Sequence, residues 1–159
     1  MTYVLILIMS FFSCNTETPT TFSKEALSDT FIDLKGHSIL FKDILEANKG
    51  KTIVIDVWAS WCSDCIKGMP KVKALQSDFK DVTYLFLSLD KSEESWKKGI
   101  KKYKVEGQHY FMQSGWKGAF GTFVELDWIP RYMIINPDGT IKVFKAIEAD
   151  DNKIIEALK

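Results

Sequence analysis

The hydrophobic residues follow two patterns along the chain, one typical of buried strands and one typical of amphipathic helices. Nearly continuous apolar runs at residues 52–59 and 82–89 predict two strands that are buried on both faces of a sheet. In residues 62–79 and 91–103, apolar side chains recur instead every three or four positions, which predicts two helices. Strand and helix therefore alternate through the middle of the chain, as in an α/β fold.

Shorter patterns complete this expected fold. Residues 31–34 and 38–41 predict two short strands around a turn at Gly36, and residues 43–47 predict one helical turn. Near the C-terminus, the predicted elements are a hairpin of strands 131–136 and 140–145, joined through Asp138-Gly139, and a helix at 150–158. The order strand, helix, strand, helix, hairpin, helix predicts a central mixed β-sheet flanked by helices.

Two local features refine the expected helices. Pro70 lies inside the first one and predicts a kink, because proline cannot donate a backbone hydrogen bond. Asp90, followed three residues later by Glu93, has the spacing of a capping box and predicts the start of the second helix.

Residues 105–128 have no clear period and are rich in aromatic side chains. Within them, residues 117–125 predict a short helix. The rings fit a role in filling the core and an inserted flap. The functional alternative is that they form a groove for a protein partner beside the cysteines described below.

Composition restricts the class of protein. A chain of 159 residues with 46% hydrophobic and 26% charged residues has the composition of a globular domain of ordinary size. Lys+Arg and Asp+Glu both number 21, so the formal net charge is zero. No strong basic field favours a nucleic acid as partner.

The N-terminus resembles an export signal of the lipoprotein type. An apolar run at residues 3–12 is too short to span a bilayer, which needs about 20 residues, and it is followed by Ser13 and Cys14. We expect a signal peptide at 1–13, lipidation of Cys14, a Thr-rich tether at 14–21 and a folded domain at 22–159. A plain secretory signal and an uncleaved apolar N-terminus with a free Cys14 are the alternatives.

The other two cysteines, Cys62 and Cys65, form a Cys-x-x-Cys pair where the first buried strand gives way to a helix. Such a pair is half of a metal site or a redox pair. A metal site needs two further ligands, and the sequence contains no second pair, so no metal is expected. In a redox pair, the helix N-terminus stabilises a thiolate on Cys62, which attacks a substrate disulfide, and the more covered Cys65 then resolves the mixed disulfide.

Asp56 lies six residues before Cys62, inside the otherwise apolar strand. A buried carboxylate without a partner raises its pKa toward the range that suits proton transfer. Asp56 is therefore the candidate base that removes the proton from Cys65. The alternative is an edge position with access to water, which the flanking apolar residues disfavour.

The stretch Asp56-Val-Trp-Ala-Ser-Trp-Cys-x-x-Cys65 resembles the active site of the thioredoxin superfamily, and Met69-Pro70 with Ile129-Pro130 resembles its exported TlpA/ResA-like branch. The resemblance covers about residues 22–159. It implies a thioredoxin-like fold with an N-terminal strand extension and an insertion before a cis-proline at Pro130. It also implies that Trp61 and the Ile129-Pro130 loop contact the substrate. Arg131, directly after this proline, departs from the family pattern and is expected to add a cation to the substrate face.

Two other positions depart from the resemblance. Asp64 adds a negative charge beside the sulfur atoms, which disfavours the thiolate and predicts a reductant more than a strong oxidant. Gly68 stands where related proteins often carry Glu before Met-Pro, which predicts a different client.

The resulting expectation is a thiol-disulfide oxidoreductase that reduces or isomerises protein disulfides outside the cytoplasm, with no bound cofactor. The resemblance implies a membrane electron donor of the CcdA/DsbD type. A thiol peroxidase of the peroxiredoxin kind and a non-catalytic binding module with the same fold are the alternatives.

Overall fold

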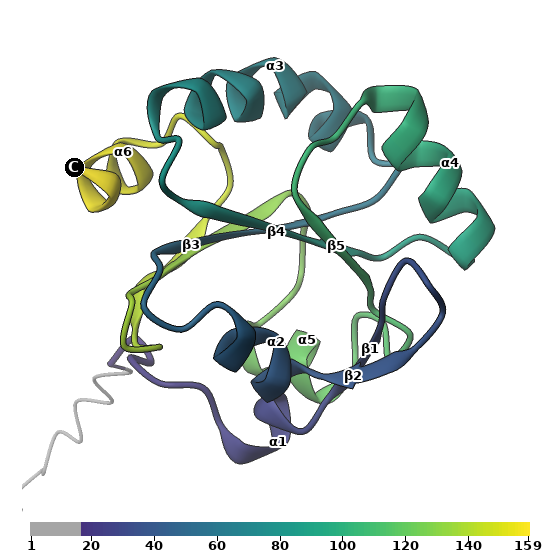
Figure 1. Ribbon diagram of the computed structural model, residues 1–159, viewed down its shortest axis with the longest axis horizontal. Helices are drawn as coiled ribbons and strands as arrows, with labels where there is room; N and C mark the ends of the chain where they lie inside the picture. The colour runs from purple at the N-terminus through teal and green to yellow at the C-terminus, as the bar shows by residue number, and fades with distance from the viewer. Residues whose placement is uncertain (1–16) are drawn as a thin grey trace, which may run out of the picture.

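A seven-stranded mixed sheet with helices on both faces makes up the described part of the chain, residues 17–159 of a computed structural model (Figure 1). The strands lie in the order β2-β1-β5-β4-β3-β6-β7. The elements in chain order are α1 (Lys24–Leu27), β1 (Thr30–Ile32), β2 (Ser38–Leu40), α2 (Phe41–Ala47), β3 (Ile53–Trp58), α3 (Ser63–Asp78), β4 (Thr83–Ser88), α4 (Glu93–Tyr103), β5 (Gln108–Phe111), α5 (Ala119–Phe123), β6 (Arg131–Ile135), β7 (Ile141–Ala146) and α6 (Asn152–Leu158). The fold is thioredoxin-like, as the sequence predicts.

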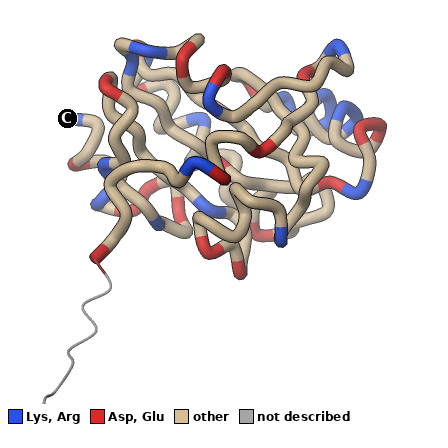
Figure 2. The backbone as a smooth tube through the Cα atoms, turned by 90° about the horizontal axis from the view of Figure 1, so that it is seen from below, with Lys and Arg blue, Asp and Glu red and all other residues tan. Residues whose placement is uncertain are grey.

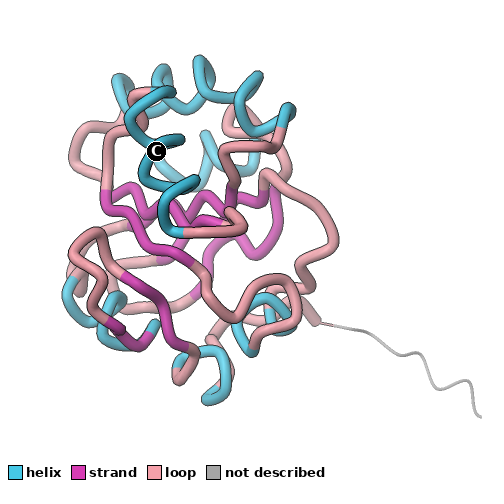
Figure 3. Tube along the Cα trace, turned by 90° about the vertical axis from the view of Figure 1, so that its right-hand side faces the viewer, coloured by secondary structure: helices cyan, strands magenta, loops and turns pink. Residues whose placement is uncertain are grey.

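The helices form two layers around the sheet. Helices α3, α4 and α6 cover one face and α1, α2 and α5 cover the other, so the strands lie between them (Figures 1 and 3). On the second face, aromatic rings contact one another at the centre of the core: Phe22, Phe31, Phe41, Phe120 and Phe123. This cluster joins the N-terminal part of the domain to the segment before β6.

Strand β3 occupies the centre of the sheet and determines where the site lies. It pairs with β4 in parallel and with β6 antiparallel, and all of its residues are buried. In this register Asp56 lies beside Tyr132 of β6 and beside Phe86 of β4. Paired residues on neighbouring strands point to the same face, so these three side chains form a row across one face.

Most of the expected elements are confirmed, with three differences. Strand β5 lies in the aromatic-rich segment and was not predicted, and neither was the short helix α1. Helix α4 begins differently from the prediction. Its N-cap is Ser92, whose hydroxyl accepts a hydrogen bond from the Ser95 amide at 3.2 Å. The capping box at Asp90 was therefore wrong, because that carboxylate has other partners, described below.

Charged residues of both signs are interspersed along the backbone, in keeping with the zero net charge (Figure 2). None of the helices between residues 17 and 159 is long and apolar enough to cross a membrane.

Candidate active site

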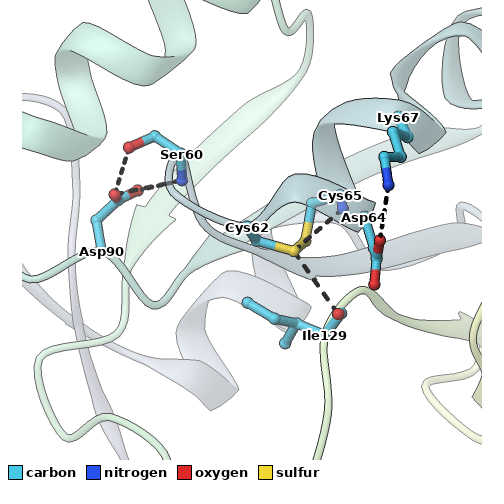
Figure 4. Close-up of a disulfide and its surroundings, with 7 residues drawn as sticks. All are labelled: Ser60, Cys62, Asp64, Cys65, Lys67, Asp90 and Ile129. Carbon is cyan, nitrogen blue, oxygen red and sulfur yellow. Dashed lines mark hydrogen bonds and ion pairs between the residues drawn. A yellow bond between two sulfur atoms is a disulfide. The ribbon is translucent and has the colours of Figure 1, made fainter.

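The cysteine pair lies at the start of α3, one short turn after β3 ends. Cys62 is the N-cap residue of the helix, and its sulfur accepts a hydrogen bond from the Cys65 amide at 3.0 Å (Figure 4). The two sulfur atoms form a disulfide, with the Cα atoms 5.3 Å apart. The predicted pairing and the predicted position of Cys62 at the helix N-terminus are both confirmed. Reduction would leave its sulfur among unpaired backbone N–H groups, which favour a thiolate.

The two cysteines differ in what lies beside them. Cys62 borders an open groove of about 390 Å³ with 6% of its surface exposed, whereas Cys65 lies on the inner side of α3 with 1% exposed. Three tryptophans line the groove: Trp61, Trp116 and Trp128. A disulfide of another protein therefore reaches Cys62 before Cys65. Trp61 and Trp128 are about half exposed or more, at 51% and 60%.

The loop before β6 closes the other side of the pair. The Ile129-Pro130 peptide bond is cis, as the resemblance implies. The Ile129 carbonyl oxygen lies 3.6 Å from the Cys62 sulfur (Figure 4). Ile129 also lines the groove, which puts a stretch of backbone beside the reactive sulfur.

Arg131 does not lie at the substrate face, and that prediction is wrong. Its side chain is fully buried, and its guanidinium donates hydrogen bonds to the carbonyl oxygens of Val124 and Glu125 and to Asp127. It follows Pro130 directly, but strand alternation turns it to the face opposite Tyr132. The cation therefore holds the segment that follows α5.

Asp56 lies under the cysteine pair without a partner. Neither of its carboxylate oxygens has a hydrogen bond of ordinary geometry among the described residues, and only 2% of its surface is exposed. Burial raises the pKa of Asp56 from 3.8 to about 8, and the nearby Tyr132 hydroxyl opposes this rise only in part. The carboxyl group is thus protonated at neutral pH but close to its point of ionisation.

The direction of the Asp56 side chain follows from its neighbour. Tyr132, its partner in the register, reaches helix α3, because a methyl group added at Gly68 would lie 3.7 Å from the Tyr132 hydroxyl. Asp56 must point toward the same helix. Gly68 is three residues after Cys65 and shares its side of the helix, so the carboxyl group faces the buried cysteine.

The sequence did not predict the hydrogen bonds of Asp90 that fix the turn before Cys62. Asp90 accepts hydrogen bonds from the Ser60 amide at 3.1 Å, from its hydroxyl at 2.6 Å and from the Ser88 hydroxyl at 2.8 Å (Figure 4). Gly99 of α4 packs so closely that a methyl group added there would lie 2.4 Å from the Ser60 Cβ. The acidic residue directly after a buried strand was the available signal, but it was assigned to a helix cap.

The charge beside the pair is partly neutralised. The Asp64 carboxylate lies 3.6 Å from the Lys67 ammonium, and both side chains are exposed to solvent (Figure 4). Solvent and this cation weaken the influence of Asp64 on a Cys62 thiolate.

Within residues 17–159, no three or more His, Cys, Asp or Glu side chains gather as a metal site. Cys14 and the predicted signal peptide lie outside the described residues.

Comparison with known proteins gives one consistent result. The Thioredoxin-like family model matches residues 50–141. The thiol-disulfide oxidoreductase ResA of Bacillus cereus is 31% identical over 134 residues, which cover 82% of this chain and 71% of that protein.

Solved structures agree with this match. A candidate thiol-disulfide oxidoreductase from Bacteroides vulgatus superposes with a TM-score of 0.70 at 28% identity, covering 86% of this chain and 87% of its own. A thiol:disulfide interchange protein from Bacteroides sp. superposes with a TM-score of 0.65 at 30% identity, covering 87% and 89%. The chain therefore belongs to the thioredoxin superfamily, and within it to the thiol-disulfide oxidoreductases.

Proposed function

We propose that the protein reduces or isomerises disulfides of protein clients outside the cytoplasm, with Cys62 as the attacking and Cys65 as the resolving cysteine. The observation that carries the proposal is the unequal setting of the two sulfur atoms. Cys62 borders an open groove at a helix N-terminus, and Cys65 is enclosed above an unpaired carboxyl group. The groove, with its exposed rings and the backbone at Ile129, suits an extended client segment more than a small molecule.

The reaction balances without a bound cofactor, because the two cysteines carry the electrons. The Cys62 thiolate attacks one sulfur of the client disulfide, a mixed disulfide forms, and the first client sulfur leaves as a thiolate. Cys65 then gives its proton to the ionised form of Asp56, which is a minor fraction at neutral pH, and attacks the Cys62 sulfur, which releases the second client thiolate. The client disulfide gains two electrons, and Cys62 and Cys65 end as the disulfide.

A new cycle needs an electron donor that reduces the Cys62–Cys65 disulfide. By resemblance to the exported branch of the superfamily, we propose a membrane donor of the CcdA/DsbD type. The direction of the reaction follows from the local charge. Asp64, although partly neutralised by Lys67, opposes the thiolate that a strong oxidant must stabilise, which supports reduction or isomerisation over oxidation.

We also propose that a lipid on Cys14 anchors the domain to a membrane after removal of residues 1–13. Phe22 packs against Phe41 with ring centroids 4.9 Å apart, and the Thr20 carbonyl accepts a hydrogen bond from the Ile141 amide. The ring contact supports a folded domain that starts near residue 22, whereas the hydrogen bond ties Thr20, near the end of the expected tether, to β7. Cys14→Ala should move the protein from the membrane fraction to the soluble fraction, and an unchanged distribution would refute the anchor.

Trapping experiments test the client reaction. In Cys65→Ser the mixed disulfide cannot be resolved, so clients should remain covalently bound through Cys62 and appear on non-reducing gels. Cys62→Ser is the matched control, since it keeps the other cysteine and should trap none of these clients. Equal trapping by both variants, or only adducts of glutathione-like small thiols, would refute the proposal.

A further inference from the structure

The row of side chains on the α3 face of the sheet continues beyond the carboxyl group. Asp56 lies next to Tyr132 in the register of β3 and β6, and Tyr132 is 1% exposed. Its hydroxyl influences the carboxyl group and opposes the rise of the Asp56 pKa, although no hydrogen bond of ordinary geometry joins the two side chains. The tyrosine itself has a raised pKa, caused first by burial and then by the charge of Asp56.

The far side of the same tyrosine reaches a pocket on the surface. The pocket has a volume of about 270 Å³. Tyr132, Gly68 and Pro130 line it, together with charged residues of α3 and of the loop after β7. Gly68 leaves no side chain against the hydroxyl, since even a methyl group at this position would lie in van der Waals contact with it at 3.7 Å. Tyr132 thus extends from a buried acid to a solvent-filled hollow.

We propose that the Tyr132 hydroxyl connects Asp56 to the pocket beside Gly68 and conducts the proton that Asp56 exchanges with Cys65. The inference rests on the proposed oxidoreductase function and extends it. A buried acid that takes a proton in each cycle must release it before the next. Both Asp56 oxygens are buried and without a hydrogen bond of ordinary geometry among the described residues, and Tyr132 is the neighbour whose hydroxyl acts on the carboxyl group, so it is the group that can pass the proton on.

The proton transfer balances in both directions. When Cys65 attacks the mixed disulfide, its thiol proton goes to an oxygen of Asp56 that has already lost its own proton through the same route. The protonated Asp56 then gives this proton to the Tyr132 oxygen, while Tyr132 releases its own hydroxyl proton to water in the pocket. When the Cys62–Cys65 disulfide is reduced, the proton moves in the opposite direction, from the pocket through Tyr132 and Asp56 to Cys65. Tyr132 is neutral before and after each transfer, which fits its raised pKa.

Other ionisable groups face this route from each neighbouring element. On α3 they are Asp64, Lys67 and Lys71, and on the loop after β7 they are Glu148 and Asp150. Lys71 pairs with both of these acids, so the rim of the pocket is held by ion pairs.

Across the sheet, the titratable side chain on this face is His109, which stacks on Phe86 with ring centroids 5.2 Å apart. The ring of Phe86 separates it from Asp56.

The test follows a single resolving step as a function of pH. Cys62 is loaded with 5-thio-2-nitrobenzoate as a mixed disulfide, and the release of this coloured thiolate by Cys65 is timed in wild type, Tyr132→Phe, Gly68→Leu and the double variant. In Tyr132→Phe we expect the rate near neutral pH to fall about tenfold and the apparent pKa to rise by about one unit, the size of a lost hydrogen bond to a charged group.

Gly68→Leu covers the hydroxyl from the other side and should also slow the step. The double variant should be no slower than Tyr132→Phe, because both changes block one route. A wild-type rate and pH profile in Tyr132→Phe, or full additivity in the double variant, would overturn the relay. Equal thermal midpoints of wild type and Tyr132→Phe show that the ring still packs.

Asp56→Asn in the same assay separates the two proposals. If this variant is slow while Tyr132→Phe matches wild type, the relay fails and Asp56 keeps its role as the base. If Asp56→Asn also matches wild type, then both the relay and the role of Asp56 fail.

Discussion

At the start of β6, the two faces of the sheet differ in how many hydrogen bonds a buried ionisable side chain makes. Arg131 points to the α5 face, where two carbonyl oxygens and Asp127 accept hydrogen bonds from its guanidinium. Tyr132, the next residue, points to the α3 face, where Asp56 lies buried with both oxygens unpaired. Among the described residues, the neighbouring strand positions thus mark one charge whose two terminal nitrogens are hydrogen-bonded, with only its Nε unpaired, and one acid with no hydrogen bond of ordinary geometry.

This difference separates structure from chemistry. A buried charge that donates several hydrogen bonds holds its surroundings in place, and removing it leaves its partners unsatisfied. A buried carboxyl group without partners destabilises the fold when it ionises, and such groups with shifted pKa values gather at reactive sites. The Arg131 face should therefore control stability, and the Asp56 face should control reactivity.

The largest expected effect lies on the partnered face. Arg131→Met keeps the length of the side chain but leaves the carbonyl oxygens of Val124 and Glu125 without donors. We expect a loss of about 3–5 kcal/mol in the free energy of unfolding, measured by urea denaturation. Lys145→Met is the control, because Lys145 approaches the same Asp127 at 3.5 Å but is exposed. Equal losses in the two variants would remove the contrast between the faces.

On the reactive face, Asp56→Asn should slow turnover and leave the fold intact. Loss of a general base costs about 100-fold in rate, measured as reduction of a disulfide-bonded protein at neutral pH. Stability at pH 9 should rise, because the variant has no buried charge at that pH. Asp29→Asn is the control, a carboxylate that accepts hydrogen bonds from Ser114 and the Phe120 amide. It should lose stability at an unchanged rate per folded molecule, and the reverse pattern would contradict the comparison.

The pH dependence of stability sharpens the contrast further. Folding raises the pKa of Asp56 from 3.8 to about 8. Between these values the native state holds a proton that the unfolded state has lost, so the contribution of Asp56 falls as pH rises. Its slope is at most about 1.4 kcal/mol per pH unit. Urea denaturation from pH 4 to 9 should show this decline in wild type and lose it in Asp56→Asn. Parallel curves would refute the shifted pKa.

The smallest expected effect concerns the exposed partner of Arg131. The Asp127 side chain is 70% exposed, so solvent screens its ion pair with the guanidinium. We expect Asp127→Asn to change the thermal midpoint by an amount near the limit of measurement. A loss comparable to that of Arg131→Met would mean that the carboxylate, and not the carbonyl oxygens, holds the arginine.

Much of the fold could be predicted because its central elements are strongly patterned. The apolar run of β3 and the helical spacing after Cys65 are local signals, and so are the upstream acid and the Cys-x-x-Cys spacing. Strand β5 was not predicted from the sequence, because it begins with a polar residue. Gln108 exchanges side-chain hydrogen bonds at 2.8 Å and 3.1 Å with Asn48, which is far away in the chain.

The errors at the site have the same origin. Arg131 was predicted to be an exposed cation. Its partners are backbone carbonyl oxygens, and no local sequence pattern indicates a buried site formed by them. Asp90 matched a helix cap, but Ser60 and Ser88 offer it three hydrogen bonds across the sheet edge. Polar residues find their partners through tertiary structure, so a local pattern identifies their chemistry better than their position.

The most direct test of this account is a titration of the Asp56 carboxyl carbon by NMR in the oxidised protein, with Asp56→Asn to assign the signal. The account predicts a pKa near 8, with a further rise in Tyr132→Phe. A midpoint near the ordinary value of about 4 would make the Asp56 carboxylate too weak a base to take the proton of a thiol, and would contradict its role as the proton acceptor of Cys65.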